Sequence, residues 1–287
     1  MIVSQNTNLA TDRNAMPELP EVETTKEAIR LFIGTDMFTG IKFYRKDIRE
    51  PIPRTLIKKA LIGQKILRIY RRSKYIIIET KAGSTFFHLG MSGNILAKPS
   101  RTPDVNHTHA VFSITPKKHL HFVDPRRFGR IGFTKLAIDQ HKYFKELGPE
   151  PLETHRLDDH LFASSRGKKK PIKTFLMDSQ NVVGVGNIYA SESLYKSGVN
   201  PTRPCGDVDE KTFKLIAREI KATLRRAIKA GGTTLKDFKT VDGSPGYFAI
   251  RLNVYGRDGE PCRKCSATIE AITQSGRRTF YCPQCQI

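Results

Sequence analysis

Pro17 and Glu18 are the two residues of this chain with the most distinctive chemistry. They follow Met16 in the string MPELPEVETT, which spans residues 16–25. A polypeptide that begins at Pro17 presents a secondary amine, and because α-amino groups have a pKa of about 8, part of it is unprotonated near neutral pH. Such an amine can attack an electrophilic sugar carbon and form an iminium, with Glu18 beside it as an acid–base group. An ordinary helix start, with proline and acids in the first turn, is the alternative.

Four of the five cysteines have the spacing of metal ligands. Cys262 and Cys265 form one Cys-x2-Cys pair, Cys282 and Cys285 form another, and 16 residues separate the pairs. Each pair can supply two thiolates from a tight knuckle, so we expect one structural zinc ion whose filled tetrahedron leaves no position for a substrate. Two disulfide bonds are the alternative, which the lack of a secretory signal in residues 1–15 disfavours.

Lys74 lies in a basic turn, after Arg71 and Arg72 and just before the apolar run 76–78. A lysine at the entrance of a strand can reach into a cleft, where it holds a phosphate or moves a proton. A solvated basic turn is the other interpretation, because charge clusters usually face water.

Two short glycine-flanked hexamers could enter a stack of nucleic-acid bases. Met91, in HLGMSG, is an adaptable apolar side chain that can fill a gap. Phe128, in DPRRFG, can wedge between bases, while Arg126 bonds an orphaned base and Arg127 grips a phosphate. Burial of Met91 and Phe128 in a core is the alternative.

Asn187 and Arg277 stand at two further turns. Asn187 closes a GVGN turn before a short helix, and backbone N–H groups at such a turn can bind a phosphate. The turn is not a dinucleotide fingerprint, because the third glycine is missing. Arg277 lies at the expected hairpin tip of the cysteine-rich segment, where a guanidinium can contact phosphates.

The charge balance points to a polyanionic partner. Lys and Arg total 49 against 28 Asp and Glu, which gives a net charge of +21. The excess is spread along the chain, so nucleic acid is the leading candidate, although a ribosomal or membrane-surface protein would share this feature. We find no stretch long and apolar enough to cross a bilayer.

The elements that must position these residues follow an α+β pattern. Apolar spacing predicts a helix over 21–32 and then a series of short strands that suggests a β-sandwich. A helical half follows, in which Asp207 and Glu210 have the spacing of a capping box at the start of a long helix, and a hairpin turning near Gly276 carries the last cysteines. The strands are expected at 66–69, 75–79, 85–89, 110–115, 119–123 and 129–134, and the shorter helices at 158–164, 173–179 and 188–196.

The composition divides the chain into five segments. We expect a non-native or disordered leader at 1–15, an N-terminal β-sandwich domain at 16–145, a linker at 146–156, a mainly helical domain at 157–250 and a zinc finger at 251–287.

Over residues 16–287 these motifs resemble the bacterial formamidopyrimidine-DNA glycosylase family, in the family's order. The resemblance implies a base-excision-repair enzyme that removes oxidised purines (8-oxoguanine and formamidopyrimidines) from double-stranded DNA. It implies a Schiff base on Pro17, with β- and then δ-elimination at the abasic site. Glu18 would be the acid–base partner, Lys74 would assist elimination, and Arg277 would hold the phosphate at the break.

The same resemblance implies how DNA is held. Met91, Arg126 and Phe128 would form a void-filling trio behind the flipped base, which would be covered by a loop at 231–248. Asn187 would belong to a helix–two-turns–helix element. A monomer in the bacterial cytoplasm, associated with the nucleoid, is expected. The further DNA contacts would be Arg127, His107 and Lys169.

Two other functions stay open from the residues. An endonuclease VIII-type paralogue would act on oxidised pyrimidines; Leu19, the void-filling trio and the long loop before Tyr247 argue against it. A non-catalytic DNA-binding protein follows if the residues before Pro17 are retained, because the proline nitrogen is then an amide without a nucleophilic lone pair.

Overall fold

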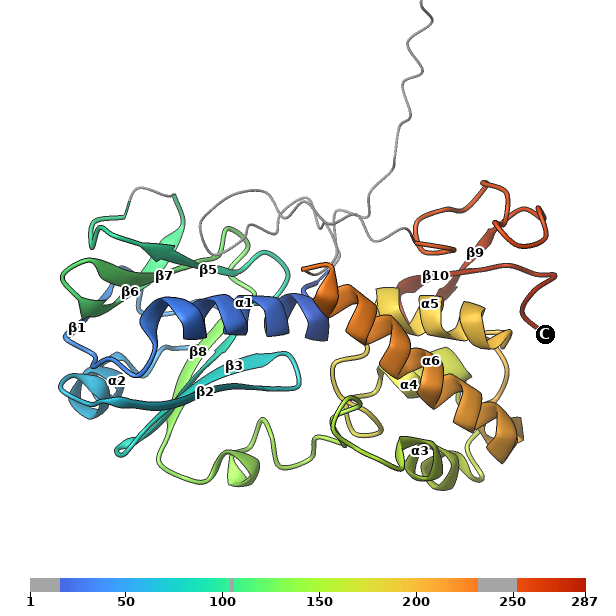
Figure 1. Cartoon of the computed structure of the whole chain (residues 1–287), viewed down its shortest axis with the longest axis horizontal. Helices are drawn as coiled ribbons and strands as arrows, with labels where there is room; N and C mark the ends of the chain where they lie inside the picture. The colour runs from blue at the N-terminus through green and yellow to red at the C-terminus, as the bar shows by residue number, and fades with distance from the viewer. Residues whose placement is uncertain (1–15, 104–105, 232–251) are drawn as a thin grey trace, which may run out of the picture.

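Two antiparallel four-stranded sheets face each other in the first lobe, as the sequence predicts (Figure 1). The computed structural model describes residues 16–103, 106–231 and 252–287. One sheet has the strand order β1-β6-β7-β5 and the other β2-β3-β4-β8. The strands of the first sheet are Gly40–Phe43, Thr108–Thr115, Lys118–Val123 and Asn94–Lys98, and those of the second are Ile66–Arg72, Tyr75–Thr80, Gly83–His88 and Arg130–Thr134.

The elements that were not predicted are short ones, of four to eight residues. Strand β1 is four residues long and buries only Ile41. Helix α2 (Arg54–Leu61) buries Ile57 and Leu61 and exposes most of the rest. Strand β5 was also missed. Elements this short carry too few apolar positions to establish a period.

Helix α1 (Leu19–Ile33) connects the two lobes (Figure 1). Val22, Ile29 and Ile33 are buried in the core of the sandwich, whereas Leu19 is buried in the core of the second lobe. The helix begins two residues earlier than predicted because Glu18 and Glu21 form a capping box around its first turn. The start of α1 is therefore fixed by both lobes.

The second lobe is a cluster of helices around one apolar core. It comprises α3 (Leu157–Ser165), α4 (Ile172–Met177), α5 (Asn187–Ser197) and α6 (Glu210–Lys229). Helix α6 buries Phe213, Ile216, Ile220 and Leu224 along one face, but the predicted cap is wrong. Asp207 ends a 3-10 turn, and Asp209 caps α6 by accepting a hydrogen bond from the Thr212 N–H at 2.7 Å. An N-cap must directly precede the first helical residue, so the nearer aspartate takes the position.

The last segment is a hairpin that packs on the helical lobe. Strands β9 (Glu270–Gln274) and β10 (Arg277–Tyr281) pair antiparallel, and Ser275 and Gly276 between them both have positive φ, as two-residue hairpin turns commonly do. Phe280 is buried in the core of the helical lobe. Among the described residues, no helix is long and apolar enough to cross a membrane.

Candidate active site

The carboxylate of Glu18 lies at the N-terminus of α5. It accepts hydrogen bonds from the backbone N–H groups of Gly186 at 2.7 Å and Ile188 at 3.0 Å, and the residue is 3% exposed. The first N–H groups of a helix have no partner within the helix, so this position attracts a carboxylate. Glu18 belongs to the first lobe and α5 to the second, so this contact also joins the lobes.

Burial raises the pKa of Glu18 above its ordinary value. The charge of Lys74 and the two backbone N–H groups oppose this rise, while the nearby carboxylate of Glu21 adds to it. Glu18 thus retains a proton to higher pH than an exposed glutamate does. A carboxyl group with a raised pKa in a cleft has the properties of an acid–base catalyst.

Glu21 holds the backbone next to Pro17, a role that sequence analysis did not assign. Its carboxylate accepts a hydrogen bond from the Glu18 N–H at 2.9 Å and another from the Tyr189 hydroxyl at 2.7 Å. Pro17 itself is buried. The capping-box spacing of Glu18 and Glu21 was the available signal, since it predicts the first of these bonds.

A cavity of about 510 Å³ lies beside Glu18, between the two lobes and the hairpin. The first lobe contributes Lys74 and Met91, the helical lobe contributes Asn187, and the hairpin contributes Arg277. Met16 and Glu18, the two neighbours of Pro17, both line it. The residues expected to carry chemistry therefore converge on one cavity from three parts of the chain.

Lys74 is half-buried and lines this cavity. Burial lowers the pKa of its ammonium, the charge of Glu18 opposes that change, and Arg277 adds to it. A lowered pKa lets the amine release and take up a proton nearer to neutral pH. This behaviour suits a proton carrier better than a solvated basic turn.

Lys173 is a fully buried lysine that the sequence analysis missed. Its ammonium donates to Asn187 Oδ1 at 2.5 Å, Thr279 Oγ1 at 2.7 Å and the Arg278 carbonyl at 3.3 Å. Burial lowers its pKa to about 7, an effect that Glu18 opposes and Arg277 increases. Lys173 thereby connects α4 to the first residue of α5 and to the hairpin. A lysine within the apolar run of α4 was its signal in the sequence.

The two glycine-flanked hexamers form adjacent loops of the first lobe. Asp124 is fully buried and accepts hydrogen bonds from Ser92 Oγ at 2.6 Å and the Gly129 N–H at 2.7 Å. Ser92 Oγ in turn accepts from the Arg126 N–H at 3.0 Å. Asp124 therefore fixes the loop that carries Met91 to the loop that carries Arg126.

Phe128 projects into solvent. The ring is 44% exposed, and the guanidinium of Arg126 lies 5.1 Å from its centre. Arg127 and His107 are exposed as well, and both have the left-handed backbone that is uncommon for residues other than glycine. A large exposed aromatic side chain beside exposed cations is arranged for a partner, not for a core.

Lys169 lies outside the cavity, on an exposed turn. In the same run, Lys170 forms an ion pair with Asp178 at 3.0 Å, and the ammonium of Lys168 lies 5.5 Å from the centre of the Phe175 ring. The loop expected to cover a flipped base lies outside the described residues from position 232 onward.

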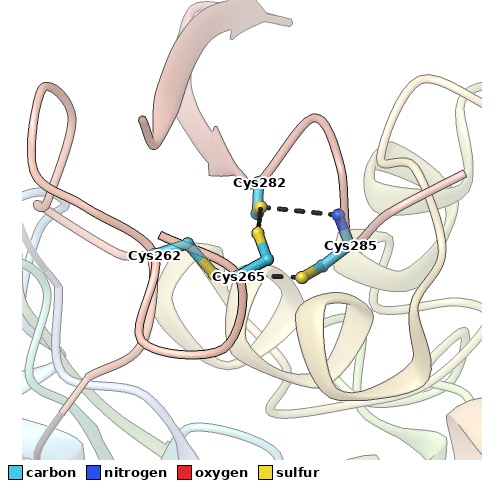
Figure 2. Close-up of side chains that lie close together, drawn as sticks. All are labelled: Cys262, Cys265, Cys282 and Cys285. Atoms are coloured by element: carbon cyan, nitrogen blue, oxygen red, sulfur yellow. Dashed lines mark hydrogen bonds between the residues drawn. The ribbon is translucent and has the colours of Figure 1, made fainter. Parts of the chain in front are cut away.

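The four predicted cysteine ligands lie together (Figure 2). Their sulfur atoms are within 4.8 Å of one another, with 3.9 Å between Cys262 and Cys285 and 3.4 Å between Cys265 and Cys282. Sulfur ligands of a tetrahedral zinc ion are about 3.8 Å apart, because each Zn–S bond is about 2.3 Å. The donor set therefore fits one structural zinc ion.

Comparison with known proteins agrees with this architecture. Residues 16–131 match the family model of the formamidopyrimidine-DNA glycosylase N-terminal domain, residues 147–239 match its H2TH domain, and residues 259–287 match the zinc finger found in FPG and IleRS. The formamidopyrimidine-DNA glycosylases of Shewanella woodyi and Stenotrophomonas maltophilia are 44% and 45% identical over 271 residues. These alignments cover 94% of this chain and 99% and 100% of the two proteins.

Solved structures show the same fold. The MutM (FPG) protein of Thermus thermophilus superposes with a TM-score of 0.82 at 33% identity, over 94% of this chain and 98% of that one. A variant of the Lactococcus lactis FPG, crystallised with DNA containing Fapy-dG, superposes with a TM-score of 0.85 at 31% identity, over 94% and 99% of the two chains.

The fold, the cavity and these matches define a DNA glycosylase of base excision repair that acts on damaged purines. The chain belongs to the formamidopyrimidine-DNA glycosylase family.

Proposed function

We propose that this protein is a bifunctional glycosylase and lyase that removes 8-oxoguanine and formamidopyrimidines from double-stranded DNA. The observation that carries the proposal is the placement of the Glu18 carboxyl group, on the N-terminus of α5, in the cavity that Lys74 and Arg277 also line. An acid–base group, the amine of Lys74 and a guanidinium thus surround the position next to Pro17.

In the proposed reaction, the amine of Pro17 attacks C1′ of the damaged nucleotide. The bond between C1′ and the base breaks, the base leaves with a proton, and the sugar ring opens to give an iminium on the proline nitrogen. Glu18 exchanges the protons of these steps, for which its raised pKa suits it. The attack needs a free amine, so the active form in this proposal begins at Pro17.

Strand cleavage follows from the iminium. Loss of a proton from C2′ expels the 3′ phosphate by β-elimination, and a second elimination expels the 5′ phosphate. Lys74 carries protons in these steps, and Arg277 holds a phosphate that flanks the lesion.

DNA binding is proposed to use the exposed loops beside the cavity. Phe128 and Met91 fill the space that the flipped base leaves, and Arg126 bonds the orphaned base. Arg127, His107, Lys169 and Asn187 contact phosphates. The net charge of +21 supplies long-range attraction to the duplex.

Excision assays on matched duplexes test this function. Duplexes carrying 8-oxoguanine, a formamidopyrimidine, an oxidised pyrimidine or no lesion are incubated with a chain that begins at Pro17. We expect release of both purine lesions and a one-nucleoside gap with phosphate on both ends, which gel mobility identifies. Faster release of the oxidised pyrimidine would assign the endonuclease VIII-type activity instead.

A further inference from the structure

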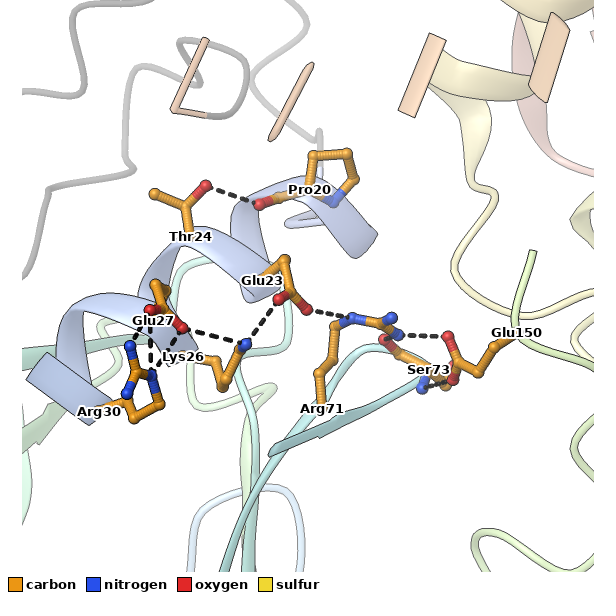
Figure 3. A network of polar contacts seen from close by, with 9 residues as sticks. All are labelled: Pro20, Glu23, Thr24, Lys26, Glu27, Arg30, Arg71, Ser73 and Glu150. Atoms are coloured by element: carbon orange, nitrogen blue, oxygen red, sulfur yellow. Dashed lines mark hydrogen bonds and ion pairs between the residues drawn. The ribbon is translucent and has the colours of Figure 1, made fainter. Parts of the chain in front are cut away.

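Glu150 is a buried linker carboxylate that receives hydrogen bonds from the turn carrying Lys74 (Figure 3). Its Oε1 accepts from the Ser73 N–H at 2.6 Å and from Arg72 Nη1 at 3.0 Å, and its Oε2 accepts from Arg71 Nη1 at 2.6 Å. Glu150 does not line the catalytic cavity. Its partners are the three consecutive residues directly before Lys74: the last two residues of β2 and the first residue of the turn that follows it.

This turn has a backbone that its sequence does not favour. Ser73 has φ +56°, in the left-handed region that glycine adopts readily and serine does not. The Ser73 N–H points at Glu150, and Arg71 Nη1 also donates to the Ser73 carbonyl at 3.0 Å. Glu150 and Arg71 thus hold both ends of the residue whose conformation aims Lys74.

The same contacts reach the helix that carries Pro17 and Glu18. Arg71 is 4% exposed, and its Nε donates to Glu23 of α1 at 2.8 Å, while Glu23 also pairs with Lys26 (Figure 3). A buried guanidinium needs compensating carboxylates, and Arg71 has one from α1 and one from the linker. The network therefore connects α1 and the Lys74 turn through one side chain.

The linker is in turn fixed to the second lobe. The Val183 N–H donates to the Pro149 carbonyl at 3.2 Å, and the Gly148 N–H donates to the Ser179 carbonyl at 2.8 Å. Arg72 reaches the same stretch, because its Nη2 donates to the Gly148 carbonyl at 2.9 Å. Glu150 thus lies on a segment anchored to one lobe and binds a turn of the other.

We propose that Glu150 is a positioning residue: it holds the left-handed turn at Ser73, and so the reach of Lys74 into the cavity, in register with the second lobe. This inference rests on the proposed role of Lys74 in strand cleavage. Glu18 is also held by contacts outside this network, from its own N–H to Glu21 and from the N–H groups of Gly186 and Ile188, so we expect loss of Glu150 to act mainly on the elimination step.

Glu150→Gln tests the proposal, because it keeps the size of the side chain and removes its charge. We expect single-turnover cleavage of a preformed abasic site to slow about tenfold, a fraction of the about 100-fold that a 1 Å misplacement of a catalytic group can cost. Release of 8-oxoguanine should change far less. Glu146→Gln, in the same linker but at an exposed carboxylate, is the matched control and should leave both rates unchanged.

Rescue by Ser73→Gly separates positioning from stability. Glycine adopts φ +56° without help, so the Glu150→Gln/Ser73→Gly double variant should recover most of the elimination rate. Its melting temperature should still stay below the wild-type value, since the charge of Arg71 has lost one of its two carboxylate partners. A double variant as slow as Glu150→Gln, or a Glu150→Gln variant with normal cleavage, would overturn the proposal.

Lys74→Met distinguishes failure of this proposal from failure of the function on which it rests. If Lys74→Met cleaves abasic DNA at the wild-type rate, the proposed role of Lys74 is wrong, and the role of Glu150 is wrong with it. If Lys74→Met is slow while Glu150→Gln is not, only the positioning role is wrong.

Discussion

Replacement of Gly186 by alanine should disable the site without touching a catalytic residue. Gly186 has φ −109° and ψ −157°, a backbone that any residue can adopt, so the effect of Gly186→Ala is steric. A Cβ at this position would lie 2.6 Å from Glu18 Oε2 and would overlap the rest of the carboxyl group. The Glu18 carboxylate must then leave its place at the N-terminus of α5.

The cost follows from the hydrogen bonds that this movement breaks. Glu18 accepts from Gly186 at 2.7 Å and from Ile188 at 3.0 Å, and hydrogen bonds to charged groups contribute about 1.5–3 kcal/mol each. Because the displaced carboxylate can bond to water in the cavity, we expect a loss of about 2–4 kcal/mol. If the transition state loses this much, excision slows about 30- to 900-fold.

Single-turnover excision of 8-oxoguanine measures this effect, with Gly40→Ala as the control. A Cβ at Gly40 in β1 would have its nearest neighbour at 3.6 Å, an ordinary contact, so this variant should stay within the about 0.5 kcal/mol typical of surface substitutions. Both variants should bind duplex DNA. Normal excision by Gly186→Ala would refute the reasoning, because the position of the Glu18 carboxylate at the N-terminus of α5 would then have no effect on catalysis.

Three further predictions concern other parts of the structure. Cys262→Ser should lose zinc, as measured by elemental analysis, and should lose DNA binding while the sandwich stays folded; wild-type protein that contains no zinc would contradict this. Phe128→Ala should slow excision from a lesion duplex more than cleavage of an abasic duplex, where extrusion costs less, whereas Leu136→Ala should change neither; equal losses on both duplexes would exclude a wedge. Lys173 has a pKa of about 7 in the folded chain and 10.5 as a free side chain, so between these pH values the unfolded chain binds one more proton than the folded chain, and the free energy of unfolding rises with pH. Lys173→Met should make this rise smaller when the free energy of unfolding is measured by denaturant titration at several pH values. An unchanged dependence on pH would contradict the role given to Lys173.

The sequence predicted the features that local spacing encodes. Each Cys-x2-Cys pair forms a tight turn from its own local sequence, and the turn at Ser275 and Gly276 determines where the hairpin between the two pairs reverses direction. The apolar periods of α1 and of the longer strands are local as well. Element ends shifted where caps decided them, as at Asp209 of α6.

The contacts that build the site could not be read in the same way. Glu18 and Gly186 are 168 residues apart in the chain, and Lys173 reaches Thr279 across 106 residues. The spacing of apolar residues within a single helix or strand cannot predict such a contact, because only the complete fold brings the two segments together. Buried polar residues such as Glu150 and Asp124 look like surface residues in the sequence, and their roles emerge from the partners that surround them.

The state of the Pro17 nitrogen tests the central claim most directly. Borohydride reduction during reaction with an 8-oxoguanine duplex should trap a covalent adduct from a chain that begins at Pro17, and peptide mapping should place the DNA on Pro17. The 287-residue chain, in which this nitrogen is an amide, should trap none unless it is trimmed. Equal trapping by the untrimmed chain, or an adduct mapped to Lys74, would contradict the account.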